Sequence, residues 1–315
     1  MWTIIVQVFP YAVAFTIPLL ITALGGLYSE RSGIVNIGLE GLMVVGFFTG
    51  ALVISKLELN MPGISIWLGL LAAFIAGALF SLLHAFACIS LNANQVISGT
   101  AINMIAGALT VFLARNITGS GNILIVHGLI RRDVPVLSDI PIVGRLFFTQ
   151  VYATTWLVLA LLAVSWFILY RTAFGLRLRA CGEHPQAADS AGINVYKMRY
   201  IAVMVSGAFA GLGGAIILVT YSGEFTGTVS GLGFLALAAL IFGQWKPLGV
   251  LGATLFFGFA STIANVSQVI PALSGIPGIL LKNFPYIVTL AVLVLSSKYS
   301  QAPRAAGEPY DKAKR

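Results

Sequence analysis

The residues best suited to binding a ligand are amides and one carboxylate that stand inside otherwise apolar stretches. Asn36 and Glu40 are four residues apart in SERSGIVNIGLEG, so on a helix they would share one face. A buried carboxylate must face the interior of a helix bundle, be protonated or find a hydrogen-bond donor. We therefore expect Glu40 to help form a polar site, with a structural hydrogen bond to a neighbouring helix as the alternative.

A second polar cluster, NANQVISGTAIN, opens another apolar stretch, and Asn103 is its deepest amide. Amides offer donors and acceptors that suit the edge of a nucleobase or the hydroxyls of a sugar. Asn265 and Gln268 stand three residues apart near the end of a later apolar stretch and suit the lining of an outer vestibule. The predicted lining of a solute pathway is therefore Asn36, Glu40, Asn103, Asn265 and Gln268.

No pattern typical of an enzyme, a metal site or a cofactor site is present in the sequence. It contains no phosphate-binding glycine loop that ends in Lys-Ser or Lys-Thr, no paired Cys or His at metal-ligand spacing, and no HExxH. We therefore expect no catalytic residue, no bound metal and no cofactor. The chain has no means of hydrolysing ATP itself.

The composition is that of a protein embedded in a membrane. Of the 315 residues, 58% are hydrophobic and only 9% are charged, whereas a soluble domain carries about 25% charged residues. The mean hydropathy is +0.96. The net charge of +8 comes from loops and the C-terminal tail, where anionic membrane lipids attract basic residues, so it does not indicate binding to nucleic acid.

A membrane-spanning helix needs about 20 apolar residues, and this criterion predicts an all-α polytopic membrane protein with about nine spans in residues 1–298. The predicted spans are Ile4–Leu24, Ile34–Ile54, Ile64–Leu91, Val96–Ala114, Val151–Tyr170, Tyr200–Tyr221, Gly231–Trp245, Leu248–Ile270 and Ile279–Ser296. The seventh is short and begins among glycines. It is therefore either a broken or re-entrant helix beside a transport path or a short tilted helix.

One polar stretch, Arg171–Arg199, orients all of these spans. It holds five basic residues and only two acidic ones, and short basic loops stay in the cytoplasm. Placing it inside puts Gly25–Gly33 and Asn92–Gln95 inside and Arg115–Gln150 outside. The N-terminus is then outside, and residues 299–315 form a basic cytoplasmic tail. The absence of Lys or Arg before Arg31 agrees with this orientation.

The same stretch predicts a short cytoplasmic helix. Proline suits the first position of a helix and glycine the position just past its end. The alanines follow three- and four-residue spacing and would present a small-residue face. The residues that form or flank the predicted helix are Glu183, Pro185, Ala187, Ala188, Asp189, Ala191 and Gly192. Such a helix can contact only lipid headgroups or a partner protein, and an ordinary basic connector is the alternative.

These stretches resemble a known family. GLRLRACGEHPQAADSAGINVYKMRYIAVMVSGAFAGLGGAI resembles the cytoplasmic loop and following helix of ABC-importer permeases of the ribose and branched-chain amino-acid type, with His184-Pro185 where many members have Asn-Pro or Asn-Glu. SERSGIVNIGLEGLM, ANQVISGTAINM and LAALIFGQWKPLGVLGATLFFG resemble the nucleoside branch of that family. The resemblance extends from about Pro18 to Lys298.

The resemblance implies a permease subunit of the cell membrane that pairs with a second, related permease. It also implies an ABC ATPase with two nucleotide-binding halves, which uses the ATP and grips the short helix, and a substrate-binding lipoprotein. Nucleosides are the expected solutes, and simple sugars such as ribose are the alternative. A proton-coupled transporter with Glu40 as its relay is a different class, but it would leave the helix in Arg171–Arg199 without a role. A structural membrane scaffold is disfavoured by the buried polar clusters.

Overall fold

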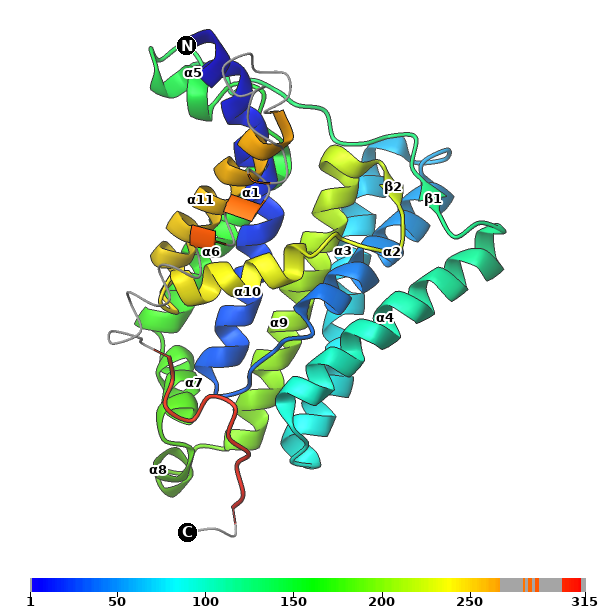
Figure 1. Ribbon diagram of the computed structural model, residues 1–315. Helices are drawn as coiled ribbons and strands as arrows, with labels where there is room; N and C mark the ends of the chain where they lie inside the picture. The colour runs from blue at the N-terminus through cyan, green and yellow to red at the C-terminus, as the bar shows by residue number, and fades with distance from the viewer. Residues whose placement is uncertain (1, 267–279, 281–282, 285–286, 289–301, 313–315) are drawn as a thin grey trace.

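The computed structural model describes residues 2–266, 280, 283–284, 287–288 and 302–312 (Figure 1). Within this part the chain is mostly helical, and seven helices are long and apolar enough to cross a membrane. They are α1 (Trp2–Arg31), α2 (Leu39–Leu57), α3 (Pro62–Ala85), α4 (Gln95–Thr118), α6 (Ala153–Arg171), α9 (Val195–Ile217) and α11 (Pro247–Val266). The predicted ninth span, Ile279–Ser296, lies almost wholly outside the described residues.

Shorter elements connect these helices. The helical ones are α5 (Val143–Phe147), α7 (Ala173–Glu183), α8 (Pro185–Ser190) and α10 (Leu232–Phe242), and the π-helical turns η1 (Phe86–Ser90) and η2 (Leu218–Ser222) extend α3 and α9. Strand β1 (Ile123–Leu124) pairs antiparallel with β2 (Glu224–Phe225), with Ile123 opposite Phe225. This ribbon joins the loop after α4 to the segment before α10.

Helix α9 forms the centre of the bundle and packs against α1, α2 and α3. Small residues allow its backbone to touch its neighbours. A Cβ atom on Gly77 of α3 would lie 2.2 Å from the Gly207 carbonyl oxygen of α9, and one on Gly207 would lie 2.4 Å from the Gly77 oxygen. This mutual approach is the contact that small residues provide between membrane helices.

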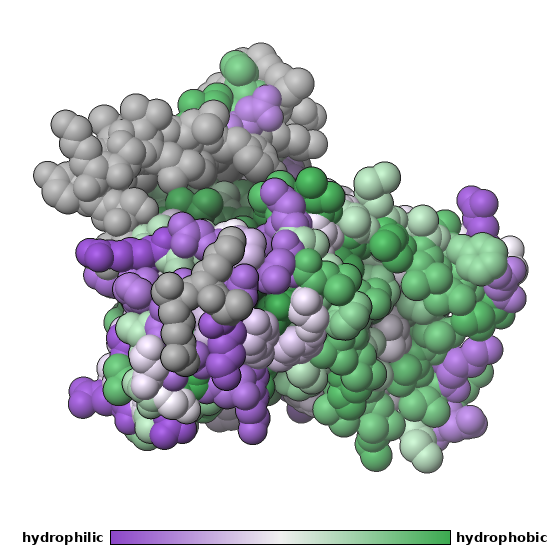
Figure 2. All heavy atoms as spheres, turned by 90° about the horizontal axis from the view of Figure 1, so that it is seen from below, coloured by the Kyte–Doolittle hydropathy of each residue, from purple (hydrophilic) through white to green (hydrophobic). Residues whose placement is uncertain are grey.

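Helix α4 lies at one side of the bundle and contacts mainly α2 (Figure 1). Its outward face carries large apolar side chains such as Ile97, Met104 and Phe112, all of them exposed. In Figure 2, which shows the molecule from below, hydrophobic residues cover one flank. Hydrophilic residues gather over the other part of this face, where Figure 1 places α7, α8 and the C-terminal tail.

The predicted boundary between the first two spans is wrong. Gly25–Gly33 is not a loop, because α1 continues to Arg31, and the chain turns only at Gly33, whose φ of +95° is readily adopted only by glycine. Gly25 lies inside α1, where a Cβ would be 2.7 Å from the Ser206 carbonyl oxygen. Its role is close packing and not chain reversal. Helix α2 begins only at Leu39, so Glu40 lies in its first turn.

Helix α10 corresponds to the short seventh span. Its 11 residues rise ~16 Å, which is about half of the hydrocarbon core. It crosses α1 at a large angle (Figure 1) and also contacts α11 and α2. The chain before it is irregular and includes Gly223, Gly227 and Gly231 with positive φ.

Candidate functional site

The predicted polar residues converge on the non-helical segment between α1 and α2, Ser32–Gly38, which we call the α1–α2 turn. Asn103 Nδ2 donates to the Ile37 carbonyl oxygen at 3.1 Å, and its Oδ1 accepts from the Gly41 amide at 2.7 Å. Asn36 is fully buried; its Nδ2 donates to Ser206 Oγ at 2.9 Å and its Oδ1 accepts from the Gly38 amide at 3.1 Å. Both side-chain amides therefore bond protein groups: Asn103 joins α4 to the turn and to α2, and Asn36 joins the turn to α9.

The expectation that Asn36 and Glu40 share a helix face is wrong, since Asn36 precedes α2 and lies in the α1–α2 turn. The Asn36 side chain instead bonds α9 through Ser206 and closes a local turn on Gly38. Such local bonding by Asn competes with helix formation. The Asn36 contacts and the left-handed Gly33 together explain why α2 starts late.

Glu40 contacts the beginning of α10. Its Oε1 accepts from the Gly231 amide at 2.8 Å, and its Oε2 accepts from the Gly233 amide at 2.6 Å. The first amides of a helix have no partner within the helix, and its N-terminus carries a partial positive charge. The carboxylate accepts hydrogen bonds from these amides and lies at the positive end of the helix, so the half-buried Glu40 has the donors that an acid in an apolar environment needs.

The other end of α10 is held by the end of α1. Arg31 donates from Nε and Nη2 to the Trp245 carbonyl oxygen at 3.0 and 2.7 Å, and the Trp245 indole donates to Glu30 Oε2. Gln244 and Trp245 have φ of +53° and +52°, which is uncommon for residues other than glycine. Residues on either side of the α1–α2 turn therefore hold both ends of α10.

A pocket of about 480 Å³ lies beside the beginning of α10. Its aromatic lining includes Phe15 and Tyr221, whose rings stack at 5.6 Å with an angle of 19°. The polar lining consists of hydroxyl and amide groups. They come from η2, from the segment that precedes α10, from α11 and from Asn283, and none of the described lining residues is charged. The described polar lining residues are Ser222, Thr226, Thr228, Ser230, Ser261, Asn265 and Asn283.

Of the two residues predicted for an outer vestibule, Asn265 lies in this pocket and is exposed. Gln268 lies outside the described residues. The arrangement of stacked rings and uncharged hydrogen-bonding groups can hold a planar polar molecule.

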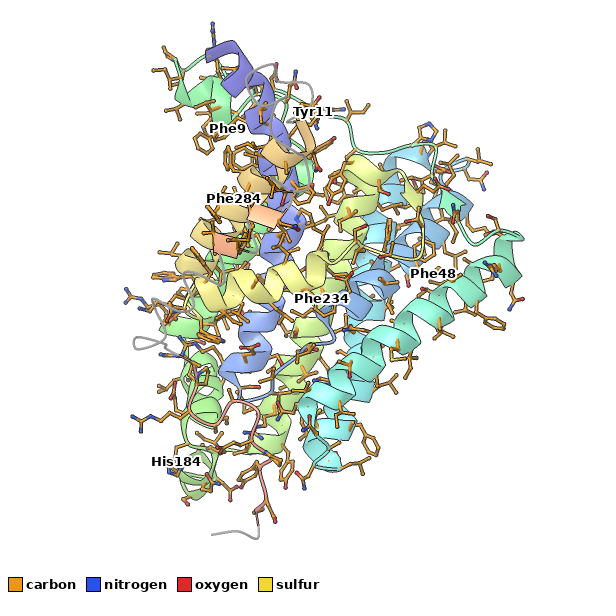
Figure 3. All side chains as sticks on the ribbon, viewed as in Figure 1. Phe9, Tyr11, Phe48, His184, Phe234 and Phe284 are labelled. Carbon is orange, nitrogen blue, oxygen red and sulfur yellow. The ribbon has the colours of Figure 1, made fainter. Side chains whose placement is uncertain are left out.

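The predicted short helix in the basic stretch is present as α8. His184 is its N-cap, where Nδ1 accepts from the Ala187 amide at 3.3 Å, Pro185 opens the helix, and Gly192 follows it with φ of +81°. Figure 3 shows His184 at the lower left of the molecule, where α7 and α8 lie. Helix α7, which the sequence analysis did not predict, fills the first half of the stretch.

The small-residue face predicted for α8 needs correction. Ala187 and Ala191 are exposed, but Ala188 is buried with only 4% exposure. Ala187 and Ala191 are four residues apart and share a face, whereas Ala188 points about 100° away toward the chain's own core. Glu183 is exposed at the end of α7, and Asp189 is half-buried.

The described part of the C-terminal tail packs against this region. The Gly307 amide donates to the Gly33 carbonyl oxygen at 3.1 Å, and the Tyr310 ring lies 5.3 Å from that of Tyr196. Arg199, only 1% exposed, donates to the carbonyl oxygens of Ser32 at 3.1 Å and Glu308 at 3.3 Å. The tail and α9 thus fix the first part of the α1–α2 turn.

Comparison with known families decides the class of this protein. Residues 9–297 match the family described as the branched-chain amino acid transport system / permease component. The chain belongs to this permease family.

Three relatives of this permease are informative. It is 50% identical to the guanosine ABC transporter permease protein NupQ of Bacillus subtilis, over 97% of each chain. It is 43% identical to the nucleoside ABC transporter permease protein NupC of Lactococcus lactis, over 95% of each chain. A second guanosine permease protein of Bacillus subtilis, NupP, is 28% identical over 90% of this chain and 79% of its own.

The α1–α2 turn is also held by residues that were not predicted to belong to the site. Gln95 Oε1 accepts from the Val35 amide at 2.6 Å, and the carbonyl oxygen of Val35 lies 3.2 Å from His84 Nε2, which must donate to it. Arg31 and Arg199 hold other parts of the same region. A basic residue at the end of an apolar helix indicates in the sequence that its side chain can bond a neighbouring segment, but it does not identify the groups that accept its hydrogen bonds.

Proposed function

We propose that this chain is a permease subunit of an ATP-driven ABC importer of nucleosides. The observation that carries the proposal is the near full-length similarity to NupQ and NupC, whose names specify guanosine and nucleosides. The pocket beside α10 supports the same solute class. A purine or pyrimidine ring could stack on Tyr221 and Phe15, while hydroxyl and amide groups bind the ribose and the base edge.

The five predicted pathway residues then divide between two roles. Asn265 contacts solute in the pocket, and Gln268 is kept as a proposed contact. Asn36, Glu40 and Asn103 shape the pathway by holding the α1–α2 turn and α10, since their polar atoms bond backbone and helix neighbours. A proton relay through Glu40 is disfavoured, because its two oxygens already serve as the cap of a helix.

The proposed transporter contains a second, homologous permease, an ABC ATPase with two nucleotide-binding halves and a substrate-binding lipoprotein. That NupP as well as NupQ resembles this chain supports the pairing of two related permeases. ATP is used by the ATPase, and this chain binds no cofactor. The exposed face of α8 with Ala187 and Ala191, flanked by Glu183 and Asp189, docks on the ATPase.

We place the protein in the cell membrane with its N-terminus outside and its C-terminus in the cytoplasm. The proposal counts nine crossings: the seven long helices, the short α10 with the irregular segment before it, and Ile279–Ser296. The N-terminus and the described tail lie at opposite ends of the bundle (Figure 1), which suits an odd number of crossings. The polar face formed by α7, α8 and the tail suits the cytoplasmic side (Figure 2).

Uptake by the purified, reconstituted complex tests this proposal. Vesicles containing the complex and its binding protein should accumulate labelled guanosine when ATP is supplied to the ATPase side, and not when a proton gradient alone is imposed. Labelled ribose should not be taken up. Uptake of ribose alone would favour the simple-sugar alternative, and uptake driven by the gradient would contradict an ABC importer.

A further inference from the structure

One side chain joins the α7–α8 region to the short helix beside the pocket. Arg31 directs Nη1 toward Glu183 Oε1 at 3.7 Å, and Nε and Nη2 toward the Trp245 carbonyl oxygen at 3.0 and 2.7 Å. Only 11% of its side chain is exposed. A guanidinium carries its donors in a planar, fixed fork, so it holds two partners in a set geometry.

The end of α7 also touches Arg31 directly. A Cβ on Gly182 would lie 2.3 Å from the Arg31 carbonyl oxygen, so the two backbones are in contact. The tail reinforces the contact, because the Ala305 amide donates to the Gly182 oxygen at 2.9 Å. The Glu183 side chain is 47% exposed, and such a pair contributes little by itself. The backbone contact is what makes the end of α7 and the end of α1 move together.

On the side of α10, Arg31 supports a strained turn. Gln244 and Trp245 both adopt left-handed backbone conformations between α10 and α11, and such conformations persist only where the surroundings hold them. The Trp245 carbonyl oxygen accepts two hydrogen bonds from Arg31, and the Trp245 indole donates one to Glu30. The geometry of this turn therefore depends on where the end of α1 lies.

Helix α10 connects that turn to the pocket. It is an uninterrupted helix from Leu232 to Phe242, and Leu232 and Leu235 line the pocket. A short helix moves as a unit, whereas a flexible segment would absorb a displacement in its own dihedral angles. A shift at Trp245 should therefore reach the pocket lining through α10.

We propose that Arg31 is a positioning residue that transmits movement of the α7–α8 region to α10 and so controls the shape of the pocket. The inference rests on the proposed function, since a partner ATPase would supply the movement. It assigns to Arg31 a role beyond stability: the link between the nucleotide state of the ATPase and the solute site.

The test uses the complete complex, purified through a tag on this chain and reconstituted in lipid. Thr226→Cys places a reporter thiol on an exposed pocket residue, while the native Cys88 and Cys181 are buried. The rate of maleimide labelling is measured with and without a non-hydrolysable ATP analogue. With Arg31 intact we expect the analogue to change this rate on the order of tenfold, a usual size for coupling between two sites.

Arg31→Ala should abolish the nucleotide-dependent change while the ATPase still co-purifies and keeps its basal hydrolysis. Stimulation of hydrolysis by solute should be lost, which a merely structural role would not require in an assembled complex. Lys56→Ala, at the exposed far end of α2, is the matched control and should behave as the parent does. Arg31→Lys keeps the charge but lacks the fork, so it should also lose most of the response.

A full nucleotide response in Arg31→Ala would overturn the inference and leave the proposed function intact. If Arg31→Ala does not fold, the Arg31→Lys variant is the test. A nucleotide response in Arg31→Lys equal to that of the parent would likewise overturn the inference. If the pocket thiol of the parent does not respond to the analogue, the inference fails, and ATP-driven guanosine uptake decides the proposed function separately. If no ATPase co-purifies with the parent chain, both fail.

Discussion

Glu40 and Gly231 are 191 residues apart in the chain, yet the Glu40 carboxylate accepts a hydrogen bond from the Gly231 amide at 2.8 Å. With the second bond from Gly233, it fixes the beginning of α10 to the first turn of α2. A pocket wall therefore depends on a side chain that does not line the pocket.

Replacement of Glu40 should uncouple α10 from α2. Glu40→Ala removes both acceptors, and because a hydrogen bond to a charged group is worth about 1.5–3 kcal/mol, we expect a loss of that order in stability together with most of the uptake. Glu40→Gln keeps one acceptor and should retain part of both. Thermal unfolding in detergent and vesicle uptake measure these effects, with the exposed Asp139→Ala as control. Full uptake by both Glu40 variants would contradict the assignment.

A bulky residue on the exposed face of α8 should block docking of the ATPase. Ala187→Trp adds a ring to an exposed position, so we expect loss of ATPase co-purification with no loss of thermal stability. Ala188→Trp should instead destabilise the permease itself, because Ala188 is buried. Ala108→Trp, on the exposed face of α4, controls for added bulk. Normal ATPase association by Ala187→Trp would show that α8 is not the docking element.

Gly33→Ala should destabilise the α1–α2 turn. Its φ of +95° disfavours a side chain, and the new Cβ would lie 2.7 Å from Arg199 Nη2, so we expect a cost of about 1–3 kcal/mol. Gly63→Ala is the matched control, since a Cβ there meets nothing within 4 Å. Thermal unfolding compares the two variants. Equal stability of the two variants would contradict the proposed importance of this close contact.

Cys181 should resist thiol reagents in the folded protein. Burial raises the pKa of its thiol to about 11, and the opposing effect of the Arg199 charge is smaller. The thiolate is the reactive form, and only about one thiol in a thousand is ionised at pH 8, so labelling should be slow there and should accelerate as the pH rises toward 11. Mass spectrometry of maleimide-treated Cys88→Ser protein measures this. Rapid labelling at pH 7 would show that the site opens.

The Tyr221 ring should contribute to solute binding through stacking. Tyr221→Ala should lower guanosine uptake at limiting solute by about tenfold, since stacking of a base on an aromatic ring is worth about 1–3 kcal/mol. Tyr221→Phe keeps the ring beside Phe15 and should remain close to the parent. A matched reduction in both variants would indicate that the hydroxyl group, and not the ring, matters.

Local patterns in the sequence were enough to predict the class of the protein and several of its helices. Runs of apolar residues predict membrane-length helices wherever they occur, because each segment satisfies its own backbone hydrogen bonds. The short helix α8 was predicted for the same kind of reason, since Pro185 and Gly192 act on the backbone next to them. Similarity to known permeases then agreed with the resemblance of the motifs.

The partners of the polar residues were decided only by the tertiary structure. Neither the capping of α10 by Glu40 nor the bonds of Arg31 to the Trp245 carbonyl can be read from spacing, because about two hundred residues separate the groups. The boundary of α2 was misplaced because a left-handed Gly33 and a buried Asn36, bonded to Ser206, outweigh an apolar run that suits a helix. The local conformational preferences of the sequence indicate where helices form, and contacts between distant segments determine where the helices end and which side chains hold them.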